Sequence, residues 1–174
     1  QSFRGGFLYD ASMSDQRIRH IVIVGGGTAG WMAAASLSNH FANSDVKITV
    51  VESSAIATIG VGEATIPAIR DYYKGLGIDE FELMRATQAT VKLGIEFTDW
   101  FRRGESFMHP FGLFGLPARD VSFHQYWLRG RAAGETSKFG EYSLAIALAK
   151  RNRFTRPHPQ PETALSVFDW ALHF

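Results

Sequence analysis

The stretch of sequence that decides the fold is HIVIVGGGTAG at residues 20–30. Four β-branched residues follow His20 without polar alternation, which predicts a parallel strand buried on both faces. The glycines end this strand, and the apolar spacing that follows predicts a helix over residues 31–41. A second strand is predicted at residues 47–51, so residues 19–52 are expected to form one β-α-β unit.

The glycines of this turn have the spacing of a dinucleotide-binding loop. Gly25 permits a tight turn, Gly27 lets the backbone approach a pyrophosphate, and Gly30 allows close helix–strand packing. The following helix N-terminus offers N–H groups to phosphates. Glu52 lies 22 residues after Gly30, where an acid accepts hydrogen bonds from a ribose, so FAD or NAD is predicted rather than NADP. The alternative is a purely structural turn. The candidate residues are Gly25, Gly26, Gly27, Thr28, Ala29, Gly30 and Glu52.

Composition excludes several other classes of function. The chain has 174 residues, 45% of them hydrophobic and 20% charged, which is typical of a globular domain. The absence of cysteine excludes disulfides, thiolate metal sites and a cysteine nucleophile. A net charge of +1 gives no electrostatic reason to expect a nucleic-acid or membrane partner. We therefore expect a cytoplasmic protein without a metal site, and its oligomeric state is left open.

The two ends of the chain suggest a piece of a larger protein. Residues 1–12 are expected to be a tag or an upstream extension, because Met13 begins a segment typical of a natural start. The other end, SVFDWALHF at residues 166–174, is aromatic and is expected to have nothing downstream to cover it. Residues 13–174 are thus expected to be the N-terminal part of one larger domain.

A Ser/Ala/Gly loop at residues 53–66 connects the β-α-β unit to the rest of the chain. Thr65 is predicted to cap a helix over residues 66–76, with Pro67 in its first turn. The glycines near Gly60 follow the second strand, on the side where a dinucleotide is expected. They are interpreted either as cofactor contacts or as a flexible connection.

Two further helices and a strand are predicted downstream. Asp79 begins a helix that ends near residue 88, and a short helix is predicted at residues 143–151. Residues 90–98 alternate between apolar and polar side chains, which predicts a half-buried strand. Lys92 lies on its polar face, where a lysine is usually only solvated.

Taken together, several blocks of this sequence resemble the flavin-dependent tryptophan halogenases. The matching blocks are VGGGTAGWMAA at 24–34, GVGEATIP at 60–67, KLGIEFTDW at 92–100 and SFMHPFG at 106–112. The resemblance runs from Arg19 to Phe174. It implies an α/β fold, namely an incomplete Rossmann-like FAD-binding domain of the flavin monooxygenase type. It adds to the candidate cofactor contacts the loop residues Gly60, Val61, Gly62, Glu63 and Ala64.

The resemblance also implies a reaction. FADH2 from a separate, diffusing flavin reductase reacts with O2, and chloride or bromide is oxidised to hypohalous acid. In the family a lysine, matched here by Lys92, meets this oxidant as a haloamine or as a hydrogen-bond donor. The halogen then substitutes an indole or tryptophan ring. His109 and Phe111 match residues that flank the substrate, with Phe111 offering a stacking face.

Some features of the family are absent from this sequence. There is no Trp-x-Trp-x-Ile-Pro motif, and the glutamate that pairs with the family's lysine lies downstream of the matching region. Residues 101–174 are expected to begin the substrate-pocket region only. The chain by itself is therefore expected to fold poorly and not to halogenate. Two alternatives stay open: an FAD-dependent aromatic hydroxylase or monooxygenase, and a non-catalytic flavin-binding remnant.

Overall fold

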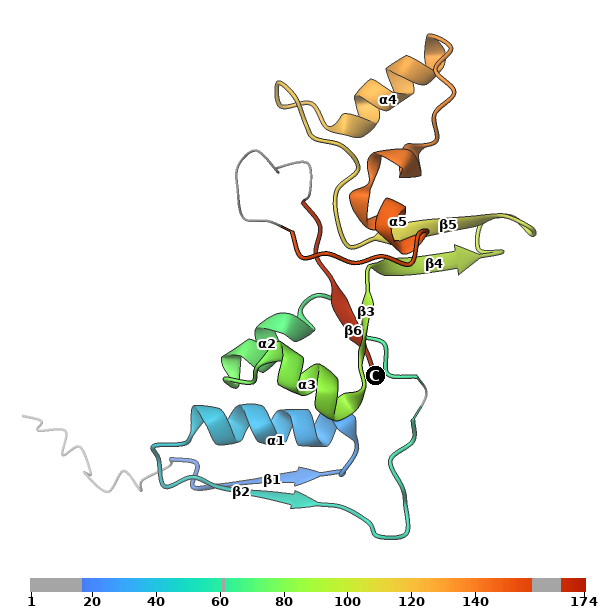
Figure 1. Ribbon diagram of the computed structural model, residues 1–174. Coiled ribbons are helices and arrows are strands. Elements are labelled where there is room, and N and C mark those ends of the chain that lie inside the picture. The colour runs from blue at the N-terminus through green and yellow to red at the C-terminus, as the bar shows by residue number, and fades with distance from the viewer. Residues whose placement is uncertain (1–16, 61, 158–166) are drawn as a thin grey trace, which may run out of the picture. The chain divides into compact units, whose positions relative to one another are not determined.

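The computed structural model describes residues 17–60, 62–157 and 167–174. The chain divides into two compact units, residues 1–59 and residues 60–174, which are called unit 1 and unit 2 below. Each unit contains its own strands and helices (Figure 1).

Unit 1 is the predicted β-α-β unit. Strand β1 (His20–Val24) and strand β2 (Lys47–Val51) pair in parallel over their whole length, and helix α1 (Thr28–His40) connects them. The two strands have the predicted bounds. The helix begins three residues earlier than predicted because extended Gly27 is its N-cap, so it starts directly from the turn.

The prediction that β1 is buried on both faces is wrong for the described structure. Ile21 and Ile23 are half-buried, and Ile23 lies next to Gly30 of α1. Val22 and Val24, whose side chains alternate to the opposite face, are 51% and 84% exposed. One helix on a two-stranded sheet covers only one face, so within unit 1 the burial is one-sided.

Unit 2 begins with two helices packed on a two-stranded sheet. Helices α2 (Ile69–Gly75) and α3 (Glu80–Thr87) precede strand β3 (Thr90–Lys92), which pairs antiparallel with β6 (Ala171–His173). Tyr73 of α2, Ala89 and Leu172 of β6 form the buried cluster between these elements.

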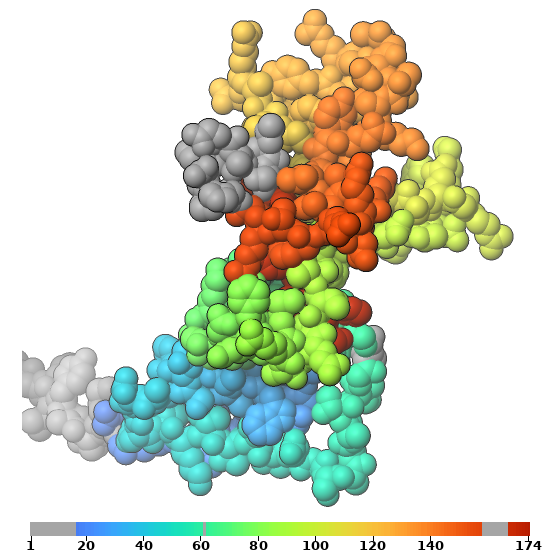
Figure 2. Space-filling view, in the orientation of Figure 1, coloured from blue at the N-terminus to red at the C-terminus, as the bar shows by residue number. Residues whose placement is uncertain are grey.

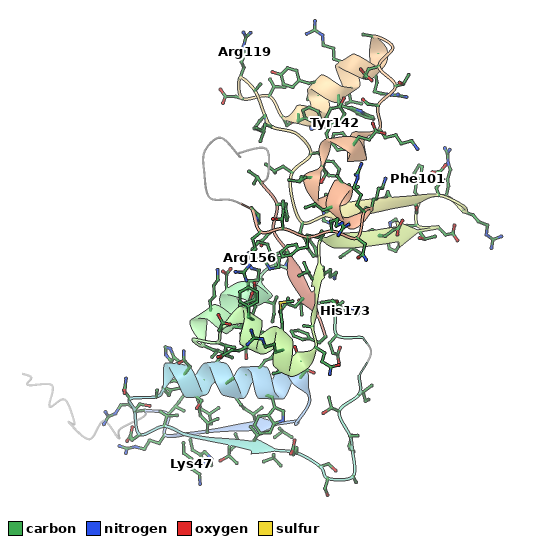
Figure 3. All side chains as sticks on the ribbon, in the orientation of Figure 1. Lys47, Phe101, Arg119, Tyr142, Arg156 and His173 are labelled. Atoms are coloured by element: carbon green, nitrogen blue, oxygen red, sulfur yellow. The ribbon has the colours of Figure 1, made fainter. Side chains whose placement is uncertain are left out.

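The remainder of unit 2 is a hairpin followed by short helices. Strands β4 (Gly94–Thr98) and β5 (Ser106–Pro110) pair antiparallel, and α4 (Phe123–Ala132), the 3-10 helix η1 (Phe139–Tyr142) and α5 (Leu144–Ala149) follow. Figures 2 and 3 show the hairpin projecting from the rest of unit 2, with Phe101 near its tip. A second buried cluster contains Leu93, Ala145, Phe168 and Trp170.

The predicted strand over residues 90–98 is interrupted at Leu93. β3 pairs with β6, whereas β4 pairs with β5, so the two halves belong to different sheets. Leu93 is buried in the second cluster, and its carbonyl accepts the Phe111 N–H at 2.8 Å. The predicted alternation is present only in β4, where Ile95 and Phe97 are half-buried and Glu96 and Thr98 are exposed, whereas Lys92 and Gly94 are half-buried.

The predicted start of α3 is confirmed, but that of α2 is wrong. Asp79 Oδ1 accepts the N–H groups of Phe81 and Glu82 at 2.9 and 3.0 Å, as an N-cap does. Thr65 caps no helix, and α2 begins only at Ile69. The Thr65 hydroxyl is instead hydrogen-bonded to Leu172, 107 residues away in the sequence.

The expectation that the aromatic end of the chain is uncovered is wrong for residues 168 and 170–172, whereas Val167 and Phe174 are 51% and 37% exposed. Phe168 and Trp170 are 7% and 6% exposed, and Ala171 and Leu172 are fully buried. These side chains fill both clusters of unit 2 because β6 lies between β3 and the segment around Ala64. None of the helices in the described part of the chain is long and apolar enough to span a bilayer.

Candidate active site

The glycine-rich turn of unit 1 is tightly packed at two of its glycines. An ideal Cβ at Gly26 would lie 1.9 Å from Glu52 Oε2, and one at Gly30 would lie 1.8 Å from the Gly25 carbonyl oxygen. Gly25 has a φ of +124°, and its N–H donates to the Val51 carbonyl at 2.9 Å. The protein's own atoms therefore leave no space for a side chain at Gly26 and Gly30, and the backbone conformation favours glycine at position 25.

Gly27 differs from its neighbours in this turn. A Cβ there would meet no protein atom within 4 Å, and its φ of −78° suits any residue. It is the N-cap of a 13-residue helix whose first turn has no side-chain cap, so exposed Thr28 and Ala29 offer backbone N–H groups at the positive end of the dipole. Open space at Gly27, these donors and exposed Glu52 fit the phosphates and ribose of a dinucleotide such as FAD.

The loop that follows belongs to unit 2 and lies along β6. Ala64 forms an antiparallel bridge with His173, and the Glu63 carbonyl accepts the Phe174 N–H at 3.1 Å. Gly62 has a φ of +78°, a backbone conformation that favours glycine. Gly60 has open space around it, and Val61 lies outside the described residues.

Lys92 is the last residue of β3 and lies opposite Ala171 of β6. Its side chain is half-buried rather than freely solvated, and Nζ donates to the Thr65 carbonyl at 2.9 Å. The Phe111 ring centroid is 5.5 Å from the same nitrogen. The fold thus brings three groups together: the Lys92 ammonium, the ring of the predicted substrate residue Phe111, and the carbonyl of Thr65. Thr65 directly follows the predicted cofactor loop.

His109, the other predicted substrate residue, lies on β5 opposite Ile95 and is exposed. No contact described for it joins it to Lys92. Phe111 follows β5 directly, and its half-buried position is fixed by the hydrogen bond to Leu93. That these two residues flank a substrate stays a prediction.

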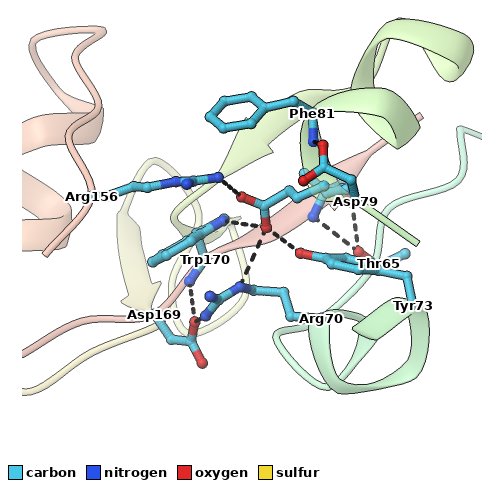
Figure 4. Close-up of polar contacts among 10 residues, drawn as sticks. Thr65, Arg70, Tyr73, Asp79, Phe81, Arg156, Asp169 and Trp170 are labelled. Atoms are coloured by element: carbon cyan, nitrogen blue, oxygen red, sulfur yellow. Dashed lines mark hydrogen bonds and ion pairs between the residues drawn. The ribbon is translucent and has the colours of Figure 1, made fainter. Parts of the chain in front are cut away.

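A polar cluster around Glu80 was not predicted (Figure 4). The Glu80 carboxylate accepts hydrogen bonds from Tyr73, from Arg156 and from Trp170 Nε1, the last at 3.2 Å. Arg70 adds an ion pair with Glu80 at 3.5 Å, places its guanidinium 3.5 Å from the Trp170 ring centroid, and pairs with Asp169. The members of this cluster lie between residues 70 and 170, so no local pattern in the sequence predicts it.

The cluster shifts the pKa values of its members. Burial, together with Glu80, raises the pKa of Tyr73 to about 12. Burial acts to raise the pKa of Glu80 as well, but hydrogen bonds from Tyr73 and Arg156 outweigh it, so this pKa lies below its ordinary value. An open cavity of about 370 Å³ borders Glu80, Tyr73 and Trp170. Because Glu80 is paired on all sides, we interpret the cluster as structural.

Comparison with known proteins gives consistent results. The family model for tryptophan halogenase matches residues 20–174. Tryptophan 6-halogenase ThaL of Streptomyces albogriseolus is 43% identical over 140 residues, covering 71% of this chain and 26% of its own length. Tryptophan 7-halogenase RebH of Lentzea aerocolonigenes is 36% identical over 176 residues, covering 91% and 32%.

Solved structures agree in fold. BrvH, a flavin-dependent halogenase from Brevundimonas sp. BAL3, superposes with a TM-score of 0.81 at 56% identity, over 90% of this chain and 30% of that one. The chain therefore spans about a quarter to a third of the length of the relatives it matches. Its fold is α/β and Rossmann-like, as predicted. On sequence and structure together, the chain belongs to the tryptophan halogenase family.

Proposed function

We propose that this protein takes part in FADH2-dependent halogenation of an electron-rich aromatic ring of the indole class, tryptophan included, with Lys92 as the catalytic residue. The observation that supports this most directly is the placement of the Lys92 ammonium. It is held at the Thr65 carbonyl beside the Phe111 ring, next to the loop predicted to contact the cofactor. Membership of the family supplies the reaction class.

The glycine-rich turn and Glu52 would hold the cofactor. The helix N-terminus after Gly27 would bind its phosphates, Glu52 would accept hydrogen bonds from its ribose, and the loop at residues 60–64 would line the flavin. Reduced FAD, with O2 and chloride or bromide, supplies hypohalous acid when bound. A separate flavin reductase would deliver the reduced cofactor by diffusion, in the cytoplasm.

Lys92 has two routes for using this oxidant. As an ammonium it donates a hydrogen bond to the HOX oxygen, which makes hydroxide a better leaving group. As an amine it attacks the halogen, giving N–X and water. In either case the ring carbon takes the halogen with a ring electron pair and then loses its proton, so ArH and HOX give ArX and water. His109 and Phe111 are proposed to orient the flat ring.

The test uses the intact protein with a flavin reductase, NADH, FAD, bromide and tryptophan or indole. Lys92→Ala should abolish halogenated product while the rate at which O2 oxidises the reduced flavin stays at the wild-type value. Lys74→Ala, on the exposed side of α2, is the matched control and should halogenate normally. Halogenation that survives in Lys92→Ala, or a hydroxylated product insensitive to this variant, would contradict the proposal.

A further inference from the structure

The segment around Thr65 pairs with β6 on the side opposite β3. The Thr65 N–H donates to the Leu172 carbonyl at 3.1 Å, and the Phe174 N–H donates to the Glu63 carbonyl at 3.1 Å. These bonds flank the bridge between Ala64 and His173. Thr65 and Leu172 are therefore opposite each other at a hydrogen-bonded position of an antiparallel ladder.

A regular ladder at this position would have a second bond. Residues at a hydrogen-bonded antiparallel position exchange both bonds, so the Leu172 N–H would donate to the Thr65 carbonyl. Instead it donates to the Thr65 hydroxyl at 3.1 Å, and the hydroxyl donates to the Leu172 carbonyl at 2.6 Å. The side chain of Thr65 thus takes the place of its own carbonyl.

The carbonyl released in this way accepts the Lys92 ammonium at 2.9 Å. Lys92 lies on the far side of β6, directly opposite Ala171, and cross-strand partners share one face of a sheet. A methyl side chain at Ala171 lets the lysine reach across β6 to the carbonyl. No other hydrogen bond of Lys92 is described, which leaves the remaining N–H donors of the ammonium available.

We propose that Thr65 is the positioning residue for Lys92: its hydroxyl satisfies the Leu172 N–H and so keeps the Thr65 carbonyl free to hold the ammonium. The importance of this contact for catalysis rests on the proposed function, whereas the contact itself does not. A residue without a hydroxyl at this position would restore the regular ladder bond, because the buried N–H of Leu172 requires an acceptor. Lys92 would then lose its hydrogen-bond partner.

The experiment compares Thr65→Val, which keeps the shape but removes the hydroxyl, with Thr65→Ser, which keeps the hydroxyl. Both are made in the intact protein, and Thr87→Val is the control because Thr87 also donates its hydroxyl to a carbonyl in unit 2. Each is labelled with an amine-reactive acetylating reagent, and mass spectrometry gives the rate at Lys92 relative to Lys74 and Lys150. The halogenation rate is measured in parallel.

We expect Thr65→Val to raise the relative labelling of Lys92 by about fivefold, the factor for one lost hydrogen bond of ordinary net strength. Halogenation should fall through kcat with little change in the substrate KM. Thr65→Ser and Thr87→Val should label Lys92 as the wild type does. Wild-type labelling in folded Thr65→Val, or equal effects of Val and Ser, would overturn the inference.

The experiment also distinguishes failure of the proposed function from failure of the positioning contact. If the wild type makes no halogenated product while Lys92 labelling still responds to Thr65→Val, the proposed function fails and the positioning contact stands. If Thr65→Val does not fold, a high-resolution crystal structure of the wild-type protein decides. A Leu172 N–H bonded to the Thr65 hydroxyl supports the inference, and one bonded to the carbonyl overturns it.

Discussion

At the scale of single residues, glycines of one turn are required for different reasons. Gly26 and Gly30 have no room for a Cβ within the protein, whereas Gly27 has room on every side. Packing within the protein therefore does not explain a glycine at position 27. If the turn binds the cofactor as proposed, variants at Gly30 and Gly27 should separate stability from cofactor binding.

Gly27→Ala should lower the thermal stability of the cofactor-free protein only slightly, since alanine is a poorer N-cap than glycine, and should weaken FAD binding roughly tenfold, or about 1.4 kcal/mol. The physical reason is that the added methyl group meets no protein atom and would occupy the space in which the phosphates are proposed to bind. Flavin fluorescence titration and thermal melting measure the two effects. Gly30→Ala, where the methyl meets the Gly25 carbonyl, should instead lower the melting temperature. Wild-type FAD affinity in Gly27→Ala would contradict this assignment.

Tyr73 is expected to make the free energy of unfolding of unit 2 depend on pH in the alkaline range. Its pKa is raised from the ordinary 10.0 to about 12, so the folded form retains a proton that the unfolded chain loses first. The contribution is therefore complete below pH 10 and is lost as the pH rises through 12. The difference corresponds to about 3 kcal/mol.

Urea unfolding between pH 9 and pH 12 measures this dependence. The free energy of unfolding of the wild type should fall more steeply over this range than that of Tyr73→Phe, which has no phenol proton to lose. Tyr126→Phe is the matched control, since Tyr126 is 40% exposed. Parallel curves for the wild type and Tyr73→Phe would show that Tyr73 does not have this role.

At the scale of elements, the N-cap of α3 can be tested by itself. Asp79→Ala should lower the free energy of unfolding by about 1 kcal/mol, because two N–H groups lose their acceptor. Asp79→Asn should retain most of that stability, since asparagine caps helices as well. Urea unfolding followed by circular dichroism compares the two. Equal losses in both variants would mean that the charge of Asp79, rather than its cap, is what matters.

Elements with local causes were predictable from the sequence. β1, β2 and α3 have their predicted positions because β-branched runs and an Asp N-cap act within a few residues. The interruption at Leu93 and the late start of α2 were not predictable. They result from Phe111 and Leu172, partners that are distant in the sequence.

In the candidate site, too, residues with local causes were predictable and residues placed by distant partners were not. The glycine turn and Glu52 are contiguous with predicted elements, so the sequence indicated them. Lys92 was singled out only by resemblance, because its partner Thr65 reaches it through the pairing of β6. The Glu80 cluster and helix α4 have no local pattern that distinguishes them. Tertiary pairing decides these features, and a single sequence does not display it.

At the scale of the whole molecule, the two units differ in how they are held together. Unit 1 is a parallel ladder with one helix, and its strands are separated by a single connection. Unit 2 depends on β6, which contributes the fully buried Leu172. Damage to β6 should therefore weaken the packing of unit 2.

Leu172→Ala should lower the free energy of unfolding of unit 2 by about 3 kcal/mol, the usual loss for a buried leucine that leaves a cavity. Hydrogen exchange read by mass spectrometry should show faster amide exchange in β3 and α2, which pack against Leu172 or pair with β6. Leu128→Ala, which truncates a leucine that is 49% exposed on α4, should change neither. Wild-type exchange rates in β3 and α2 of Leu172→Ala would contradict this role of β6.

The position of β6 has a consequence for the order in which the protein forms on the ribosome. Synthesis proceeds from the N-terminus, so β1, α1 and β2 can assemble as soon as residue 51 has emerged. Thr65 must wait for Leu172, 107 residues later, and Lys92 waits for the same strand. During that interval the surfaces later covered by β6 are exposed to solvent. Slow translation over this stretch would lengthen the period in which a chaperone can bind them.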